Sequence, residues 1–125
     1  YSKMFKFDKS LSISAKPKSN GKYTLHQVNV SFMNIDEQDY WNTDNDQGIS
    51  LKIEVIPDGK SAVDYWNRRV TGIIEPGRSI QRSYQHKEVE FSHNITVRAT
   101  LYPEANVELE PIEKTLKAEE LGSVK

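Results

Sequence analysis

The sequence predicts an all-β domain, an antiparallel sandwich of about seven strands. Apolar and polar residues alternate with a period of two in one segment after another, as they do in strands with one buried and one wet face. Turn-forming Gly and Pro residues separate these segments at the spacing typical of sandwiches and barrels. No strand–helix–strand order accompanies them, which argues against a parallel sheet. We favour a sandwich over a small barrel.

Three runs of alternating apolar residues predict the strands of the first half. They are Phe5, Phe7, Leu11 and Ile13; Val28, Val30 and Phe32; and Ile49, Leu51, Ile53 and Val55. Tyr23 and Leu25 alternate in the opposite phase to the run that follows them, so we expect a bulge or bend near His26. The polar stretch 34–48 is long for a simple hairpin loop.

The clearest strand of the second half covers residues 94–101, where apolar and polar side chains alternate without a break. Weaker strand candidates are residues 62–74, 78–84 and 105–116. Pro111 cannot donate to a ladder, so it favours an edge or a strand end for the last of these.

Turns are predicted where the alternation stops, because Gly tolerates positive φ and Pro presets its own. These turns are Ser19-Asn20-Gly21, Pro57-Asp58-Gly59 and Pro76-Gly77. A helical pattern occurs only in residues 113–121. We therefore assign residues 1–112 to the sandwich and residues 113–125 to a short C-terminal helical or frayed tail, or a linker.

Length and charge narrow the classes of function. A chain of 125 residues fits one domain. Its net charge of −1 lacks the basic excess of domains that bind phosphate backbones, so we expect no nucleic-acid partner. No apolar run approaches the roughly 18 residues of a membrane span, so none is predicted in this chain. The chain begins at Tyr1, and any signal peptide is expected upstream of it.

The residues that catalysis commonly requires do not form a recognisable motif. Without cysteine, the chain has no disulfide, thiolate zinc site or cysteine nucleophile. It also lacks a Gly-x-Ser-x-Gly elbow, a phosphate-binding Gly-rich loop and an HExxH helix. We predict that the protein is not an enzyme.

A repeated tetrapeptide contains both tryptophans. Asp39-Tyr40-Trp41-Asn42 recurs as Asp64-Tyr65-Trp66-Asn67. One interpretation is a carbohydrate platform in which the rings of Tyr40, Trp41, Tyr65 and Trp66 stack on sugars. The favoured interpretation is packing, since amphipathic aromatic residues commonly cover cores and sheet edges.

Arginines gather around the Pro76-Gly77 turn in the sequence. Arg68, Arg69, Arg78 and Arg82, with Trp66 and Tyr84, are candidates for a cationic and aromatic face. Such a face suits an anionic partner or a protein interface, where Arg, Tyr and Trp are enriched. The alternative, which we favour, is ordinary strand residues that face water.

An acidic stretch raises the question of calcium. Asp36, Asp39, Asp44 and Asp46 supply hard oxygen ligands close together in the sequence. The EF-hand spacing fails because Gly48 comes one place late and Ile53 stands where the final Glu belongs. A solvated polar loop is favoured over a Ca²⁺ site, and no other cofactor is predicted.

Two segments of the second half resemble bacterial immunoglobulin-like modules. They are Ile74-Glu75-Pro76-Gly77-Arg78-Ser79 and residues 94–103, which read Asn-Ile-Thr-Val-Arg-Ala-Thr-Leu-Tyr-Pro. A Pro-Gly turn leading into a strand, followed by such an Ile-Thr-Val strand, is also similar to cell-adhesion-related and fibronectin-type-III-like surface domains. The resemblance implies an immunoglobulin-like sandwich and adhesion, spacing or ligand display. No functional residue carries over from it.

Three functional hypotheses follow. The first is a non-catalytic binding or structural module, for adhesion or spacing, in an exported or cell-surface protein. The second is a carbohydrate-binding module that uses the Tyr/Trp platform. The third is an intracellular assembly or appendage domain that adds a strand to a partner's sheet edge. A protein or glycan ligand and an extracytoplasmic location are expected for the first.

Overall fold

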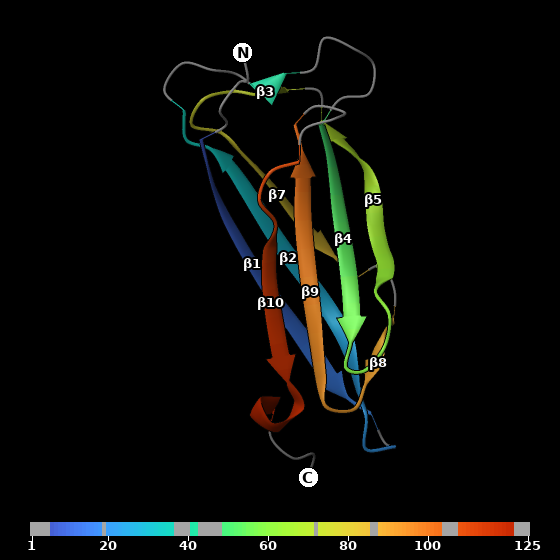
Figure 1. Cartoon of the computed structure of the whole chain (residues 1–125). Helices are drawn as coiled ribbons and strands as arrows, with labels where there is room; N and C mark the ends of the chain where they lie inside the picture. Colours follow the sequence, from blue (N-terminus) through green and yellow to red (C-terminus); the bar gives the residue numbers. More distant parts are fainter. Residues whose placement is uncertain are drawn as a thin grey trace.

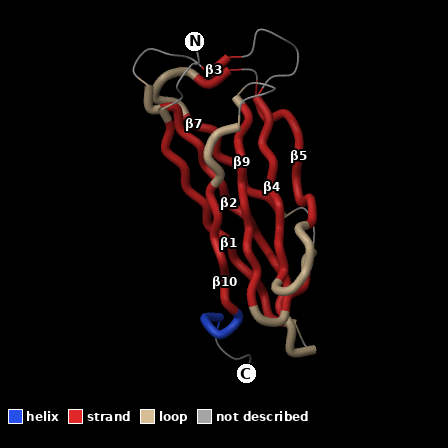
Figure 2. Tube along the Cα trace, in the orientation of Figure 1, coloured by secondary structure: helices blue, strands red, loops and turns tan. Residues whose placement is uncertain are grey.

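A computed structural model describes residues 6–18, 20–36, 41–42, 49–71, 73–85, 88–103 and 108–121. Two antiparallel sheets of four strands each pack face to face along one long axis (Figure 1), and strands make up most of the described chain (Figure 2). The strands are β1 (Phe7–Pro17), β2 (Tyr23–Asn34), β3 (Trp41–Asn42), β4 (Ile49–Pro57), β5 (Val63–Thr71), β6 (Ile73–Ile74), β7 (Ser79–Tyr84), β8 (Glu90–Phe91), β9 (Asn94–Tyr102) and β10 (Ile112–Lys117). The predicted all-β sandwich is confirmed.

The chain alternates between the two sheets, one pair of strands at a time. The first sheet has the order β1-β2-β7, and β8 pairs with β2 beyond the end of β7. The second sheet has the order β10-β9-β4-β5. A separate two-stranded piece joins β3 to β6. As a result, β1 and β7–β8 form the edges of the first sheet, and β10 and β5 form the edges of the second.

The bulge expected near His26 is present. Ser14 pairs with Gln27 and Ala15 pairs with Leu25, so His26 is the extra residue on β2. Leu25 and Val28 are both buried although two residues separate them. The bulge therefore lets both halves of β2 face the core despite their opposite phases.

The core lies between the sheets and consists of the predicted alternating residues. Its most buried side chains come from the two central strands of the second sheet and from β2. They are Val28, Phe32, Ile49, Leu51, Ile53, Val55, Ile95, Val97, Ala99 and Leu101, each 0% exposed. Burying a large apolar side chain stabilises the fold by about 1.5–3 kcal/mol, so these buried side chains are the main source of stability.

The predicted turns occur where Gly supplies positive φ. Gly21, Gly59 and Gly77 have φ of 80°, 70° and 79°. The third turn is attached to the end of β2 by Asn34, which is fully buried. The Asn34 side-chain amide donates to the Ile74 carbonyl oxygen at 3.1 Å, and the Gly77 N–H donates to the Asn34 carbonyl oxygen at 2.8 Å. This buried polar anchor was not predicted, because the sequence placed Asn34 at the start of a polar loop.

The C-terminal segment differs from the prediction of a helical or frayed tail after residue 112. Residues 112–117 form strand β10, which pairs with β9, and only Ala118–Leu121 form a short 3₁₀ turn. Ile112 and Leu116 pack against the core from this strand. Ladder pairing and apolar burial outweigh the modest helix preference of the segment. The sandwich therefore extends past residue 112.

Candidate functional site

The candidate site lies where β5 of the second sheet meets β7 of the first. We name this surface the arginine–aromatic edge and define it by Trp66, Arg68, Arg82 and Tyr84. The rings of Trp66 and Tyr84 have their centroids 4.5 Å apart with an interplanar angle of 33°. Aromatic pairs at this distance contribute about 0.5–1.5 kcal/mol beyond the area that they bury. The pair therefore joins the two sheets at this edge.

Two guanidinium groups lie at this edge. The guanidinium carbon of Arg68 is 5.0 Å from the Trp66 ring centroid, a cation–π arrangement. Arg82 donates from Nη2 to the carbonyl oxygen of Val70 at 3.2 Å, which links β7 to β5. Arg82 also donates from Nη1 to the carbonyl oxygen of Gln81 at 3.0 Å. Both arginines are exposed while they make these contacts.

The positive charge of this region is not paired within the described chain. Among the residues that the structure describes, no ion pair joins Arg68, Arg78 or Arg82 to a carboxylate. A hollow of about 310 Å³ beside the edge is lined by two arginines, Arg78 and Arg82, and by one acidic residue, Glu75, among others. Guanidinium groups bind carboxylate, sulfate and phosphate through paired hydrogen bonds, so the edge suits an anionic partner.

The Tyr84 side chain adds a buried phenol to the edge. Its hydroxyl oxygen is buried and has no hydrogen-bond partner among the described residues. Burial raises the pKa of Tyr84 above its ordinary value of 10.0, and the nearby charge of Arg82 partly offsets the rise. The phenol therefore stays neutral at physiological pH and acts by packing.

The second copy of the repeated tetrapeptide divides between the core and the edge. Tyr65 is only 1% exposed, so it is a core residue and cannot offer its ring to a sugar. Ile53 pairs with Trp66 and Glu54 pairs with Asp64, which makes Tyr65 the extra residue of a bulge. Because of that bulge, two consecutive aromatic side chains both pack against the core.

Of the first copy of the repeat, the structure describes Trp41 and Asn42, which form β3 and pair with β6 at one end of the molecule (Figure 1). Trp41 pairs with Ile74 there, and nothing is described of the Trp41 side chain. Tyr40 lies outside the described residues. Of the four predicted platform residues, only Trp66 is placed by the structure at a surface edge.

The two neighbouring arginines of β5 lie on opposite sides of the strand. Arg68 pairs with Leu51, whose side chain is buried, whereas Arg69 pairs with Ser50 and lies on the outer side of the second sheet. The structure thus brings together Trp66, Arg68, Arg82 and Tyr84 from the predicted cationic and aromatic face. Arg69 is not part of this cluster.

Of the four residues predicted to bind Ca²⁺, the structure describes only Asp36. Asp36 follows β2, and its N–H donates to the side-chain oxygen of Asn34 at 3.0 Å. Asp39, Asp44 and Asp46 lie outside the described residues. Within the described ranges, no group of three or more His, Asp or Glu side chains could hold a metal ion. A Ca²⁺ site in this stretch stays a prediction.

Comparison with protein families, with curated proteins and with solved structures finds no match for this sequence. In the described part of the chain, no helix has the length and apolar character needed to cross a membrane. Function is therefore inferred from the geometry.

Proposed function

We propose that this chain is a non-catalytic β-sandwich module, for binding or spacing, of an exported or cell-surface protein. The observation that supports this most is where the described strands begin and end. Strand β1 begins at one end of the long axis, and β10 ends at the other, where the short turn after it lies (Figure 1). A module with this arrangement can be joined in series and keep its neighbours apart.

The direction of the terminal strands suits a spacer under tension. A pull between the two ends acts along β1 and β10, perpendicular to the hydrogen bonds that join them to β2 and β9. The pairs of the 11-residue β1 would then be loaded together rather than opened one after another.

The strand order supports the immunoglobulin-like resemblance. We number the long strands β1, β2, β4, β5, β7, β9 and β10 from one to seven. The first sheet then has the order one, two, five, and the second has seven, six, three, four. Constant-type immunoglobulin domains place strands one, two, five and four in one sheet and three, six and seven in the other. The arrangement here differs in the sheet that the fourth strand joins.

Single-molecule pulling tests the spacer role. Pulling between the two chain ends is expected to need a higher force than pulling between the β1–β2 turn and the C-terminal end, because the β1–β2 turn and the end of β10 lie at the same pole (Figure 1). The variant Asn20→Cys supplies the second attachment point, because the chain has no other cysteine. An end-to-end force equal to or below that of the control geometry would contradict the spacer role.

A second experiment tests the location. Protease added to intact cells that make the full-length protein is expected to degrade the module. If the module survives until the cells are lysed, it lies inside the cell. That result would favour the intracellular assembly domain instead.

Within this proposal, the arginine–aromatic edge is the contact surface for an acidic protein partner. A fluorescent decaglutamate peptide serves as the probe. The double variant Arg68→Ala/Arg82→Ala is expected to bind it at least about tenfold more weakly, since two charge-assisted contacts of about 1 kcal/mol each are lost. Arg98→Ala is the matched control, because Arg98 already pairs with Glu54 and Glu113. Equal losses in both variants, or no binding to the parent chain, would remove the edge from the proposal.

A further inference from the structure

The outer face of the first sheet is polar and carries no charge across its centre. The register across β1, β2 and β7 aligns its outward side chains in rows. These rows are Ser10, Ser31 and Gln81; Ser12, Asn29 and Ser83; and Ser14 with Gln27. The buried residues between them, such as Leu11, Val30 and Phe32, face the core. We name these eight hydroxyl and amide residues the polar face.

Asn29 organises the middle of the polar face. The Ser83 hydroxyl donates to Asn29 Oδ1 at 2.6 Å, and Gln27 Nε2 donates to the same oxygen at 3.1 Å. Asn29 Nδ2 in turn donates to the Ser12 hydroxyl at 3.3 Å. One amide therefore links all three strands and holds the donors and acceptors around it in defined positions. Such preorganisation lowers the entropic cost of binding a ligand.

The neighbouring row remains available to a ligand. In the described part of the chain, the side chains of Ser10, Ser31 and Gln81 form no hydrogen bond with protein. These three residues line a shallow hollow of about 580 Å³ together with Ser12, Asn29 and Ser83, and Leu11, Val30 and Arg82 border it as well. That volume lies within the range of about 300–1,000 Å³ that small-ligand sites occupy.

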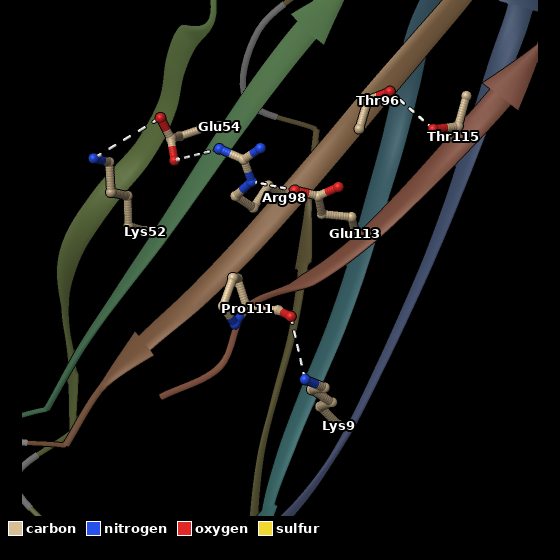
Figure 3. Close-up of polar contacts among 8 residues, drawn as sticks. All are labelled: Lys9, Lys52, Glu54, Thr96, Arg98, Pro111, Glu113 and Thr115. Atoms are coloured by element: carbon tan, nitrogen blue, oxygen red, sulfur yellow. Dashed lines mark hydrogen bonds and ion pairs between the residues drawn. The ribbon is translucent and has the colours of Figure 1, made fainter. Parts of the chain in front are cut away.

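The residue types of the polar face are not explained by strand stability. Asn is depleted in strands, whereas Thr and other β-branched residues are favoured. The outer face of the second sheet uses such residues, with Thr96 hydrogen-bonded to Thr115 at 2.8 Å beside a group of ion pairs (Figure 3). A face that departs from local strand preference is expected where function has selected the residues.

We propose that the polar face binds a neutral polysaccharide chain. The three rows hold no charged side chain, and the guanidinium of Arg82, which borders the hollow, donates to the carbonyl oxygens of Gln81 and Val70. The rows themselves therefore offer no ion pair to an acidic or a basic chain. They also offer no apolar patch to a hydrophobic partner. They offer donors and acceptors on three adjacent strands, about 4.8 Å apart, which matches a ligand whose hydroxyl groups both donate and accept. This site differs from the aromatic platform expected from the repeat, and it does not depend on the spacer role.

The proposal is tested with defined oligosaccharides. Cellohexaose, maltohexaose and chitohexaose serve as neutral probes, and hexagalacturonate serves as the charged comparison. Titration followed by amide NMR shifts is expected to show at least one neutral probe binding, with the shifts gathered on β1, β2 and β7. Absence of binding by all three at 5 mM, tighter binding of the charged probe, or shifts at Trp66 would each overturn the proposal.

Charge insertion on the two outer faces supplies a matched pair of variants. Ser31→Glu is expected to weaken oligosaccharide binding at least tenfold, whereas Thr115→Glu on the other outer face leaves it unchanged. Gln81→Ala changes an exposed side chain on an edge strand and is expected to weaken binding severalfold without affecting folding. If all of these variants bind the oligosaccharide as tightly as the parent chain does, the binding site lies elsewhere and the proposal is wrong.

A second copy of the chain is the competing ligand for the polar face. Sedimentation of the parent chain and of Ser31→Glu separates the two cases. Dimers that form with concentration and disappear in Ser31→Glu would assign the face to a second copy of the chain and overturn the glycan proposal. A monomer in both variants, together with oligosaccharide binding by the parent chain, supports it.

Discussion

The two edges where the sheets meet carry the same kind of contact and use it differently. At the β1–β10 edge, the ammonium of Lys9 lies 5.5 Å from the Phe7 ring centroid. The same ammonium donates to the carbonyl oxygen of Pro111 at 3.2 Å (Figure 3). It also donates to the carbonyl oxygen of Glu110 at 3.2 Å. This lysine lies on the inward-facing row of an edge strand, where natural sheets often place a charge to prevent edge-to-edge pairing.

At the β5–β7 edge, Arg68 lies over the Trp66 ring, but in the described chain it has no carboxylate partner. Lys9 therefore joins the two sheets at its edge by donating to backbone carbonyl oxygens. Arg68 lies over a ring in the same way but leaves its hydrogen-bond donors exposed. The comparison teaches that a cation–aromatic pair alone does not mark a binding site. What distinguishes the two edges is whether the hydrogen-bond donors of the cation are already used.

The largest expected effect breaks the aromatic join. Trp66→Ala removes the contact with Tyr84 and leaves a gap between the sheets, so the free energy of unfolding should fall by about 3 kcal/mol. Urea denaturation measures the change. Val63→Ala on the same strand is the control, because that side chain is 42% exposed and should cost less than about 1 kcal/mol. A loss below that level for Trp66→Ala would mean that the rings do not hold this edge.

The next effect concerns the polar join at the other edge. Lys9→Met keeps the aliphatic stem but removes the donor to Glu110 and Pro111, so stability should fall by about 1 kcal/mol. Chemical denaturation beside Lys16→Met, an exposed lysine of the same strand, isolates the contribution of the two hydrogen bonds. If both variants unfold at the same urea concentration, the Lys9 contact contributes nothing to closure.

A smaller effect with the opposite sign is expected at Tyr84. Tyr84→Phe removes a buried hydroxyl that has no partner among the described residues, so stability at pH 7 should stay unchanged or rise by up to about 1 kcal/mol. Burial raises the folded-state pKa of Tyr84, so the folded protein holds the phenol proton more tightly than the unfolded chain does. The free energy of unfolding is therefore unaffected by this group below its ordinary pKa and falls as pH rises from there through the folded-state pKa. Thermal melts from pH 8 to pH 12 should therefore fall less steeply for Tyr84→Phe. Parallel curves for the two proteins would contradict this.

The smallest effect tests a half-buried ion pair, Lys18 with Glu90, that belongs to neither edge. The hydrogen bond and charge of Lys18 lower the pKa of Glu90 below its ordinary value of 4.5, and the hydrogen bond with Glu90 raises that of Lys18. The contribution of Glu90 is therefore present above its ordinary pKa and is lost as pH falls through the lower folded-state pKa. Glu90→Gln should lower the melting temperature slightly at pH 7, and the difference should vanish near pH 2. Glu88→Gln is the control, and an equal shift in that variant would exclude a specific pair.

Much of the fold could be predicted because its signals are local. The phase change around His26 is visible in the order of apolar residues, and a phase change within one strand requires an extra residue. Pro57-Asp58-Gly59 and Pro76-Gly77 specify turns through backbone preferences that need no distant partner. The C-terminal strand was only a weak candidate, and its bounds were misplaced for the opposite reason, since β10 exists because it pairs with β9.

The sequence by itself determined the strand pattern, the bulge near His26, the turns and the nearness of Trp66 to Arg68. Tertiary structure decided that Tyr65 enters the core, that Tyr84 meets Trp66, that Arg82 reaches the Val70 carbonyl oxygen, and that Lys9 reaches Glu110 and Pro111 before β10. It also decided that hydroxyl and amide residues from three strands share one face. The physical reason is that periodicity and turn preference act between neighbours in the chain, whereas register, sheet order and sheet packing place distant residues together.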